Sequence, residues 1–434
     1  METKLPEGWE RNCLGNICNI AYGKDFRKKN LAAKGDLSVY GANGVIGYHD
    51  QFTHENEMLL IGCRGSVGFT RFTKPKSFIT HNCLTLEPYV EMEKRFLKYA
   101  IDASDLRNVI TGSSQPQITI SNIEKLNIVF PKKEIQEKIA DKLDSLLAKV
   151  KDAQSRLDKI PTILKQFRQS ILASAFSGEL TKDWREKNLG ANAPADLDFI
   201  KNYLMHESVT NREKKQVQEI YKFPIDNYQE DFSIPESWVL TCIGRIGLVN
   251  NGSTPSRRVS KYWKGSVPWI SSGEVKNNII SESHEKISQL GLDNCSSKLF
   301  SAGTVLIAMI GEGKTRGQSA VLGIDVAINQ NIAAIQISNG RVNSEYLWYW
   351  FQYQYENNRN YGSGSGPQAL NCQRVRELPF ILAPREEQDE VVRRINISFV
   401  QLGKFQQRLI KAIAFTDKLE QSILAKAFRG ELVR

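Results

Sequence analysis

One segment of the sequence could bind a nucleotide. Ala308-Met-Ile-Gly-Glu-Gly313-Lys314-Thr315 follows an apolar run and satisfies a loose phosphate-loop pattern. A phosphate loop must open a helix, because the amino end of that helix faces the phosphates. The next residues, 316–323, have instead the pattern of a returning strand, and the similar glycine-rich segment 59–68 has no such lysine. We therefore predict that both segments are hairpin turns, with a nucleotide-binding enzyme as the alternative.

The other residue types that could do chemistry form no recognisable catalytic set. The glycine-rich segment 362–366 precedes Pro367 without the strand-to-helix context of a dinucleotide site. The sequence lacks the Asn-Pro-Pro-aromatic or Asp-Pro-Pro-Tyr tetrapeptide of an amino-methyltransferase. The seven cysteines and five histidines lack the spacing of a zinc site or a disulfide framework. The sequence therefore predicts no catalytic residue, no metal site and no cofactor bound by this chain.

Basic and amide side chains cluster in the predicted loops of two regions. Arg and Lys suit guanine edges and phosphates, whereas Asn and Gln suit adenine edges, so such clusters are typical of surfaces that bind double-stranded DNA. Any single member could be a solvated charge, and Asn82 and Asn331 could cap turns, so the prediction depends on the clusters as sets. The first cluster comprises Lys24, Arg27, Lys28, Lys29, Arg64, Arg71, Lys74, Lys76, His81 and Asn82. The second comprises Arg257, Arg258, Lys261, Lys264, Lys314, Arg316, Gln318, Gln330 and Asn331.

An internal repeat organises these clusters into two copies. Residues 169–180 recur as residues 421–432, with ten of twelve positions identical. Further matched pairs are Gln136 with Gln388, Ile139 with Val391, Ile79 with Ile328, Asn82 with Asn331, and Leu5-Pro-Glu-Gly-Trp9 with Ile234-Pro-Glu-Ser-Trp238. Agreement is high in the tails of the copies and thin in their bodies. Two modules with similar tails and different bodies suggest two sites that have the same function but act on different targets.

Each copy ends in a predicted long helix. Apolar residues recur every three or four positions over 135–175 and 391–427, which is the spacing of a helix with one apolar face. Pro131 and Pro384 precede the two helices, Gly178 and Gly430 follow them, and Pro161 should kink or restart the first near Ile160. We expect the two helices to pack on each other as an antiparallel coiled coil; the alternative is that each packs on its own body. The residues expected on the paired faces are Ile139, Leu143, Val150, Leu157, Phe167, Ile395, Phe399, Leu402, Leu409 and Leu419.

The predicted fold class is α+β, with two bodies of short strands plus helices joined by the two long helices. Glycine-broken β-like runs such as 58–62 and 304–308 indicate the strands, and one helix is expected in each body, near residues 93–103 and 344–355. The aromatic run 346–355 could stack on bases, but its place on a helix favours a packed core face. The predicted domains are residues 1–130 (first body), 131–180 (first spacer helix region), 181–230 (charged connector), 231–383 (second body) and 384–434 (second spacer helix region).

Composition excludes several classes of protein. At 434 residues, 41% apolar and 24% charged, the chain is neither wholly disordered nor a small disulfide scaffold. The longest apolar stretch, Val305 to Ile310, is far shorter than the roughly 18 residues of a membrane span, and the first residues lack the apolar core of a signal peptide. We expect a soluble cytoplasmic protein that does not contact membranes. The net charge of +10 is spread along the chain, so the DNA prediction rests on the repeat and the local clusters.

The two Pro-Glu-x-Trp openings, the repeated twelve-residue motif and the proline-to-glutamine starts of the helices resemble the specificity subunit of a type I restriction–modification system. The resemblance covers nearly the whole chain. Its most specific motifs are residues 421–432 and their first copy, which continues as Gly178-Glu-Leu-Thr-Lys-Asp-Trp-Arg185. The second copy departs from this pattern because the sequence stops at Arg434, so that copy is either shorter or truncated.

This resemblance implies a non-catalytic subunit that reads a split, asymmetric DNA site, one half with each body. It implies that the paired helices set the gap between the bodies, with half-sites about 34 Å apart. It also implies two methyltransferase subunits, which bring S-adenosylmethionine, and restriction subunits, which bring ATP and Mg²⁺. A coiled-coil scaffold that does not bind DNA is the remaining alternative.

Overall fold

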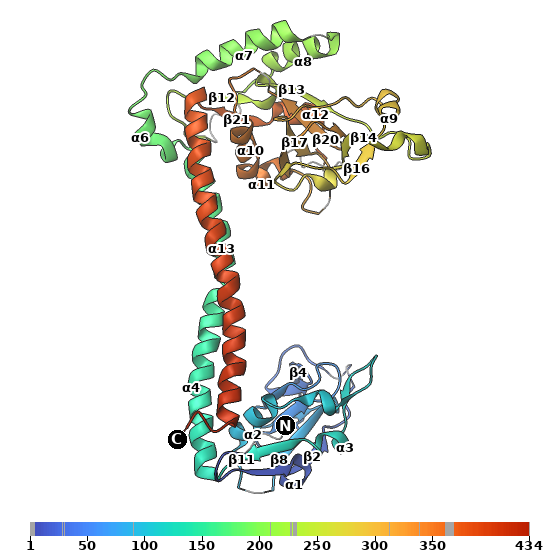
Figure 1. Cartoon of the computed structure of the whole chain (residues 1–434), viewed down its shortest axis with the longest axis vertical. Helices are drawn as coiled ribbons and strands as arrows, with labels where there is room; N and C mark the ends of the chain where they lie inside the picture. The colour runs from blue at the N-terminus through green and yellow to red at the C-terminus, as the bar shows by residue number, and fades with distance from the viewer. Residues whose placement is uncertain are drawn as a thin grey trace. The chain divides into compact units, whose positions relative to one another are not determined.

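The computed structural model describes residues 5–27, 29, 31–89, 91–208, 210–225, 228, 232–311, 313–337, 339–360 and 369–433 (Figure 1). By packing, the chain divides into two compact units. Unit 1 comprises residues 1–160 and 407–434, and unit 2 comprises residues 161–406. Each unit therefore combines one body with parts of both helical tails.

Unit 1 contains a four-stranded and a three-stranded sheet, in addition to the two-stranded pairs β1-β11 and β9-β10. The larger has the strand order β2-β8-β5-β6, and the smaller has the order β4-β3-β7, in which β3 and β7 run parallel. Strand β5, predicted from its apolar run, is buried along its whole length, as expected for a central strand. The elements are β1 (Glu10–Cys13), α1 (Leu14–Ile17), β2 (Cys18–Tyr22), β3 (Leu37–Gly41), β4 (Gly44–His49), β5 (Leu59–Gly62), β6 (Thr70–Phe72), β7 (Phe78–Ile79), β8 (Cys83–Pro88), α2 (Lys94–Asp102), β9 (Ile110–Thr111), β10 (Gln117–Ile118), α3 (Ile120–Ile123), β11 (Asn127–Phe130) and α4 (Lys133–Leu157).

Unit 2 repeats this topology with additions. Its larger sheet has the order β13-β20-β17-β18, extended by β15, and its smaller sheet has the order β16-β14-β19, again with one parallel pair. The elements are α5 (Ile160–Phe176), α6 (Lys182–Arg185), α7 (Ala193–Glu207), α8 (Asn211–Lys222), β12 (Val239–Cys242), β13 (Leu248–Asn251), β14 (Trp263–Ile270), β15 (Asn278–Ile280), β16 (Glu285–Ile287), α9 (Gln289–Asp293), β17 (Val305–Ala308), β18 (Ser319–Leu322), β19 (Ala327–Ile328), β20 (Ile332–Gln336), α10 (Ser344–Tyr353), α11 (Tyr355–Asn360), α12 (Cys372–Glu377), β21 (Pro379–Leu382) and α13 (Arg385–Phe428). The internal repeat predicted from the sequence is therefore present in the strand order of both units.

The two glycine-rich segments are hairpins, as predicted. Residues 62–70 connect antiparallel β5 and β6, and residues 308–319 connect antiparallel β17 and β18. The backbone N–H of Gly317 donates to the carbonyl of Ala308, which closes the second hairpin. Because β17 leads into a strand rather than into a helix, the geometry of a phosphate loop is absent from this described part of the chain.

The helical tails begin and end where the sequence predicted. Helix α4 ends at Leu157 and α5 restarts at Ile160, one residue before Pro161, so the predicted interruption is confirmed. Helix α13 is continuous over 44 residues. Gly178 and Gly430, which follow α5 and α13, have φ values of 80° and 73°, the left-handed backbone that commonly ends a helix.

Within each unit, parts of the two tails pack against each other and against the body. In unit 1, α4 and the end of α13 run antiparallel (Figure 1), and Gln154 Nε2 donates to Asp417 Oδ1 over 2.9 Å. In unit 2, α5 packs against the beginning of α13, and the Arg168 guanidinium lies 3.9 Å from the centre of the Phe399 ring. The predicted residues Ile139, Leu143, Val150, Ile395 and Leu409 are buried, and Leu157, Phe399, Leu402 and Leu419 are half-buried.

Phe167 is the exception among the predicted face residues. Its side chain is 55% exposed, so the expectation that it lies on a buried face is wrong. The apolar face of α5 is made instead by Ile171, Leu172 and Ala175, which join the core of unit 2. The four-residue step from Phe167 to Ile171 fits a helical period. The period alone cannot show, however, how far along α5 other residues pack against this face.

The repeated tail motif packs on the opening motif of the other copy. In unit 1 a Cβ on Gly430 would lie 3.0 Å from Pro6, and in unit 2 a Cβ on Gly178 would lie 2.4 Å from Pro235. Only glycine leaves room for this close approach at a left-handed position. The first tail motif therefore belongs structurally with the second body, and the second tail motif with the first body.

The predicted charged connector contains the helices α7 and α8. Ala193, Ile200, Leu204 and Val217 are buried in the core of unit 2, so these helices are part of that unit's packing. The aromatic run predicted as a core face is α10, where Tyr346 and Trp350 are almost fully buried. No helix among the described residues is long and apolar enough to cross a membrane.

Candidate DNA interface and helix junction

In unit 1 the backbone brings several of the predicted DNA-binding residues together. Lys24 N–H donates to the carbonyl of Ile79, and His81 N–H donates to the carbonyl of Lys24. Arg64 N–H donates to the carbonyl of Asn82. Residues separated by up to 58 positions therefore form one cluster at the ends of β5 and β8.

Unit 2 repeats this backbone frame with different side chains. Cys63 N–H donates to the carbonyl of Asn82 in unit 1, and Met309 N–H donates to the carbonyl of Asn331 in unit 2. The carbonyl of Cys63 accepts from the N–H of Ile118, just as the carbonyl of Met309 accepts from the N–H of Leu370. Gln318 and Asn331 therefore lie near each other beside β17, and Gln330 accepts a hydrogen bond from Thr254.

The predicted DNA-binding residues differ in accessibility. Lys24, Arg27, Lys29, Arg64, Lys74, Lys76, Arg257, Arg258, Lys261, Lys264, Lys314 and Gln330 are exposed, whereas Arg71, His81, Asn82, Gln318 and Asn331 are half-buried. Lys28 lies outside the described residues. Lys74 and Lys76 lie on the turn between β6 and β7, where Lys76 N–H donates to the carbonyl of Glu55, apart from the Arg64 cluster.

Arg316 contradicts the expectation of an exposed basic contact. Its side chain is only 7% exposed. It lies two positions after Lys314 on the β17–β18 hairpin, and the hairpin turns it toward the protein. Sequence alone places both cations on a loop, but it cannot show which side of a hairpin each one occupies.

Aromatic clusters adjoin the basic segments in both units, and the sequence did not predict them. In unit 1, Phe26 lies 5.5 Å from His49 and 5.0 Å from Phe78, measured between ring centres. In unit 2, Trp263 and Trp269 lie 5.3 Å apart, and the guanidinium of Arg257 lies 4.1 Å from the Trp263 ring. Each cluster joins the loop after the first strand of the larger sheet to the smaller sheet, so it fixes the position of the basic loop.

The matched glutamines at the starts of the long helices have the same role in both units. Gln136 is buried; its Nε2 donates to the carbonyl of Pro131, and its Oε1 accepts from the N–H of Glu93. Gln388 is also buried, and its Oε1 accepts from the N–H of Asn343. Glu93 and Asn343 are the N-cap residues of α2 and α10. Each glutamine therefore joins a body helix to a long helix, which positions the body on its tail.

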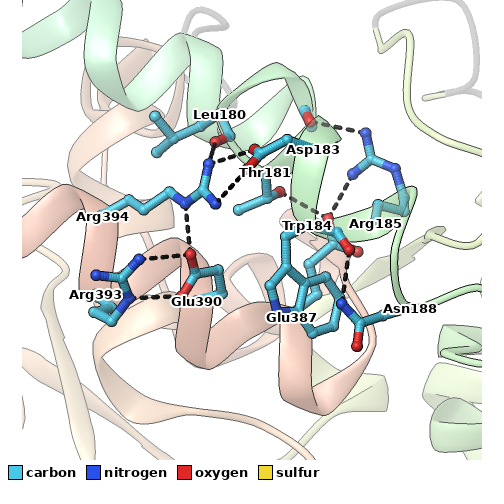
Figure 2. Close-up of polar contacts among 11 residues, drawn as sticks. Leu180, Thr181, Asp183, Trp184, Arg185, Asn188, Glu387, Glu390, Arg393 and Arg394 are labelled. Atoms are coloured by element: carbon cyan, nitrogen blue, oxygen red, sulfur yellow. Dashed lines mark hydrogen bonds and ion pairs between the residues drawn. The ribbon is translucent and has the colours of Figure 1, made fainter.

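In unit 2 the buried carboxylate of Glu387 contacts Thr181 and Arg185 beside the first tail motif (Figure 2) and also Trp238 of the second opening motif. Glu387, at the start of α13, is fully buried and accepts from Thr181 Oγ1 at 2.7 Å and from Arg185. Its other oxygen accepts from Trp238 Nε1 at 2.7 Å. A buried carboxylate is stable only when such donors replace water. The repeat does not point to Glu387, because the matching position in the first copy is Ile135.

A second ion-pair group holds α6 to α13 beside Glu387. Figure 2 shows Arg394 donating to the carbonyl of Leu180 and to both oxygens of Asp183, at 2.6 and 3.0 Å. The hydrogen bonds from Arg394 lower the pKa of Asp183 to about 2. Hydrogen bonds from Arg393 and then Arg394 likewise lower the pKa of Glu390 to about 2. The segment that continues the first tail motif is thereby fixed to the second long helix.

The described residues contain no group of three or more His, Cys, Asp or Glu side chains that could hold a metal ion. The Cys63 and Cys83 thiols are buried, and burial raises the pKa of each, to about 12 for Cys83. They have the environment of structural thiols rather than of nucleophiles.

Comparison with known proteins gives a consistent result. The family described as type I restriction modification DNA specificity domain matches residues 6–162 and 235–419. The specificity subunit of the Escherichia coli type I restriction enzyme EcoDI is 26% identical over 435 residues, covering 99% of this chain and 90% of the relative. The specificity subunit of the E. coli enzyme EcoBI is 25% identical, covering 99% of this chain and 87% of the relative.

Solved structures share the fold. The HsdS subunit of Thermoanaerobacter tengcongensis matches with a TM-score of 0.56 and 17% identity, covering 99% of both chains. A chain from a structure concerned with complex assembly and conformational transition of the type I R-M system matches with a TM-score of 0.60 and 16% identity, covering 99% of this chain and all of the other. With the family match over both copies of the repeat, the chain belongs to the family of type I restriction–modification DNA specificity domains.

Proposed function

We propose that this chain is the non-catalytic DNA-recognition subunit of a type I restriction–modification complex. Each body reads one half of a bipartite, asymmetric site on double-stranded DNA. The helical tails act as a coiled-coil spacer that sets the gap between half-sites and docks two methyltransferase subunits. Those subunits bring S-adenosylmethionine, and the restriction subunits of the full complex bring ATP and Mg²⁺.

The observation that carries this proposal is that the two bodies share a set of backbone hydrogen bonds but differ in the side chains around it. The same backbone hydrogen bonds recur around Asn82 and Asn331, while Lys24 and Arg64 of unit 1 are replaced in this frame by Ser253 and Ile310 of unit 2. Direct readout depends on which donors and acceptors meet a base edge. Two bodies with the same backbone arrangement but different donor and acceptor side chains are therefore suited to two different half-sites.

Exposed apolar side chains on the tails support the docking of partner helices. In unit 2, Ile163, Phe167 and Val400 are 56%, 55% and 58% exposed, and in unit 1 Phe415 is 65% exposed. Large apolar side chains in water on helix surfaces are typical of positions covered in an assembly. Phe167, which is not part of the buried face of its own unit, is therefore a candidate contact to a partner.

Binding to double-stranded DNA by the full chain, followed at increasing salt, tests the proposal against the scaffold alternative. Phosphate contacts give a logarithmic salt dependence with a slope of about −0.9 for each phosphate neutralised. We expect a steep decrease in affinity with salt. A chain that bound no duplex at low salt would contradict DNA recognition and favour a scaffold.

A further inference from the structure

The smaller sheet of unit 2 is interrupted beside the predicted basic loop. Trp263 and Val267 of β14 both pair with Ile287, so residues 264–266 bulge out of the strand. Lys264 has a φ of 61°, a left-handed backbone that is uncommon for a residue other than glycine. Bulges and such backbone positions re-aim side chains and are frequent next to binding sites.

The bulge borders an arginine that is held on three sides. Arg257 Nη1 and Nη2 donate to the two carboxylate oxygens of Glu285, at 2.7 and 2.8 Å. The guanidinium lies 4.1 Å from the centre of the Trp263 ring and 5.6 Å from that of Trp269. The side chains of Arg257 and Glu285 remain 57% and 40% exposed, so another anion can reach the pair.

These residues surround a cavity of about 650 Å³. Its charged side chains are three cations and one carboxylate, and the aromatic wall is Trp263. A planar guanidinium with two lysines nearby suits a phosphate, which Arg binds with two parallel hydrogen bonds. The lining residues are Arg257, Ser260, Trp263, Lys264, Gly265, His284, Glu285 and Lys286.

We propose that this cavity binds a phosphate group of the DNA backbone through Arg257, Lys264 and Lys286, and that Glu285 competes with the phosphate for Arg257. The inference rests on the proposed function, since the duplex must lie against the second body. Because Glu285 already accepts two hydrogen bonds from Arg257, a phosphate gains less free energy at this site, whatever the base sequence. Glu285 thereby lowers the affinity of the second body for duplex DNA in general.

The first body provides a natural control. Lys34 and Gly35, just before β3, correspond to Lys264 and Gly265 at the start of β14. A cavity of about 770 Å³ is lined in part by Lys34 and Gly35. That cavity is lined by one lysine and by two carboxylates, Asp36 and Asp50. Its charge does not favour a phosphate, so the same substitution should have different effects in the two bodies.

The test measures binding of the full chain to a random-sequence duplex by fluorescence anisotropy over a salt series. Glu285→Gln should bind about three- to tenfold more tightly, as expected when one charged contact is released. Lys264→Gln and Arg257→Gln should weaken binding and should each make the logarithmic salt slope shallower by about 0.9. Lys34→Gln should leave both affinity and slope unchanged.

Two controls separate the proposal from a general charge effect. Glu282→Gln makes the same charge change at an exposed position of the preceding segment, and it should give a smaller gain than Glu285→Gln. The double variant Arg257→Gln/Glu285→Gln should lose the gain, since Glu285 acts through Arg257. Unchanged thermal unfolding midpoints will show that the variants are folded.

Several results would overturn the inference alone. Weaker binding by Glu285→Gln would mean that Glu285 orients Arg257 for DNA instead of competing for it. An equal effect of Lys264→Gln and Lys34→Gln would remove the distinction between the two cavities. Absence of duplex binding by the unchanged chain would instead overturn the proposed function, and this inference with it.

Discussion

Glu387 joins three segments that are far apart in the sequence. The carboxylate receives hydrogen bonds from Thr181 and Arg185 of the first tail motif and from Trp238 of the second opening motif. Replacing a buried, paired charge leaves its partners without a counterion, which costs more than the pair itself contributes. The stability of this junction therefore depends on the charge of one residue.

Glu387→Gln should lower the free energy of unfolding of unit 2 by about 2–3 kcal/mol, because Gln keeps the shape but supplies no charge for Arg185. Chemical denaturation followed by tryptophan fluorescence measures the change. The neighbouring exposed residue gives the control, since Glu386→Gln should change stability by less than about 0.5 kcal/mol. Equal effects of the two substitutions would refute the role of the buried carboxylate.

His54 should make unit 1 less stable in mild acid. Burial, and then the charge of Lys24, lower the pKa of His54 in the folded state. The unfolded chain therefore binds a proton first as the pH falls below about 6.5, which favours unfolding. Stability should be highest above this pH and should decrease as the pH falls toward the folded pKa.

Thermal unfolding of the unchanged chain and of His54→Gln between pH 7.5 and pH 5 tests this sign. The variant should lose less stability over the interval, because its side chain does not titrate. Parallel pH curves for the two proteins would show that His54 makes no contribution.

At the scale of single residues, the repeat identified equivalent positions in the two copies better than it identified what each side chain contacts. Matching Gln136 with Gln388 identified two side chains that make equivalent buried hydrogen bonds. Glu387 has no acidic counterpart in the first copy, so comparison of the copies could not reveal it. The burial of Arg316 depends on the direction of a hairpin, which is a tertiary property.

The helical tails show which features of an element follow from local chemistry. Proline and glycine predicted the starts, the ends and the break at Pro161, because these residues restrict the backbone directly. The apolar period predicted a helix with one buried face. It could not show which segment covers that face, and Phe167 is exposed because the packing of α5 is made by residues further along the helix.

Leu143→Lys should separate α4 from the end of α13 in unit 1. Leu143 is fully buried in the core shared by the body and both helices, and a lysine there would bury a charge. We expect loss of about 3–5 kcal/mol of stability, as for other core disruptions, together with weaker docking of the methyltransferase subunits. Thermal unfolding and size-exclusion chromatography of the assembled complex measure the two effects.

Ala148→Lys provides the matched control, since Ala148 lies on the exposed face of the same helix. It should leave the unfolding midpoint and the assembly unchanged. If Leu143→Lys assembled as well as the control, the packed helix pair could not be what docks the partners.

For the whole molecule, the repeat predicted two bodies with the same arrangement of elements, and the matching strand orders of the two units confirm this prediction. The sequence did not reveal that each tail motif packs with the other copy's opening motif. The contacts of Gly430 with Pro6 and of Gly178 with Pro235 join residues separated by almost the whole chain and by the charged connector, respectively. Local patterns carry no information on such pairings, because either tail could meet either opening with the same apolar chemistry.

Exchange of one body tests the central proposal, that each body reads one half of the DNA site. Residues 1–130 would be replaced by the first body of another family member, and modified bases would be mapped genome-wide in a host that carries the complete system. We expect one half of the recognised sequence to change, with the other half and the gap between them preserved. A change in both halves, or in neither, would contradict recognition by separate bodies.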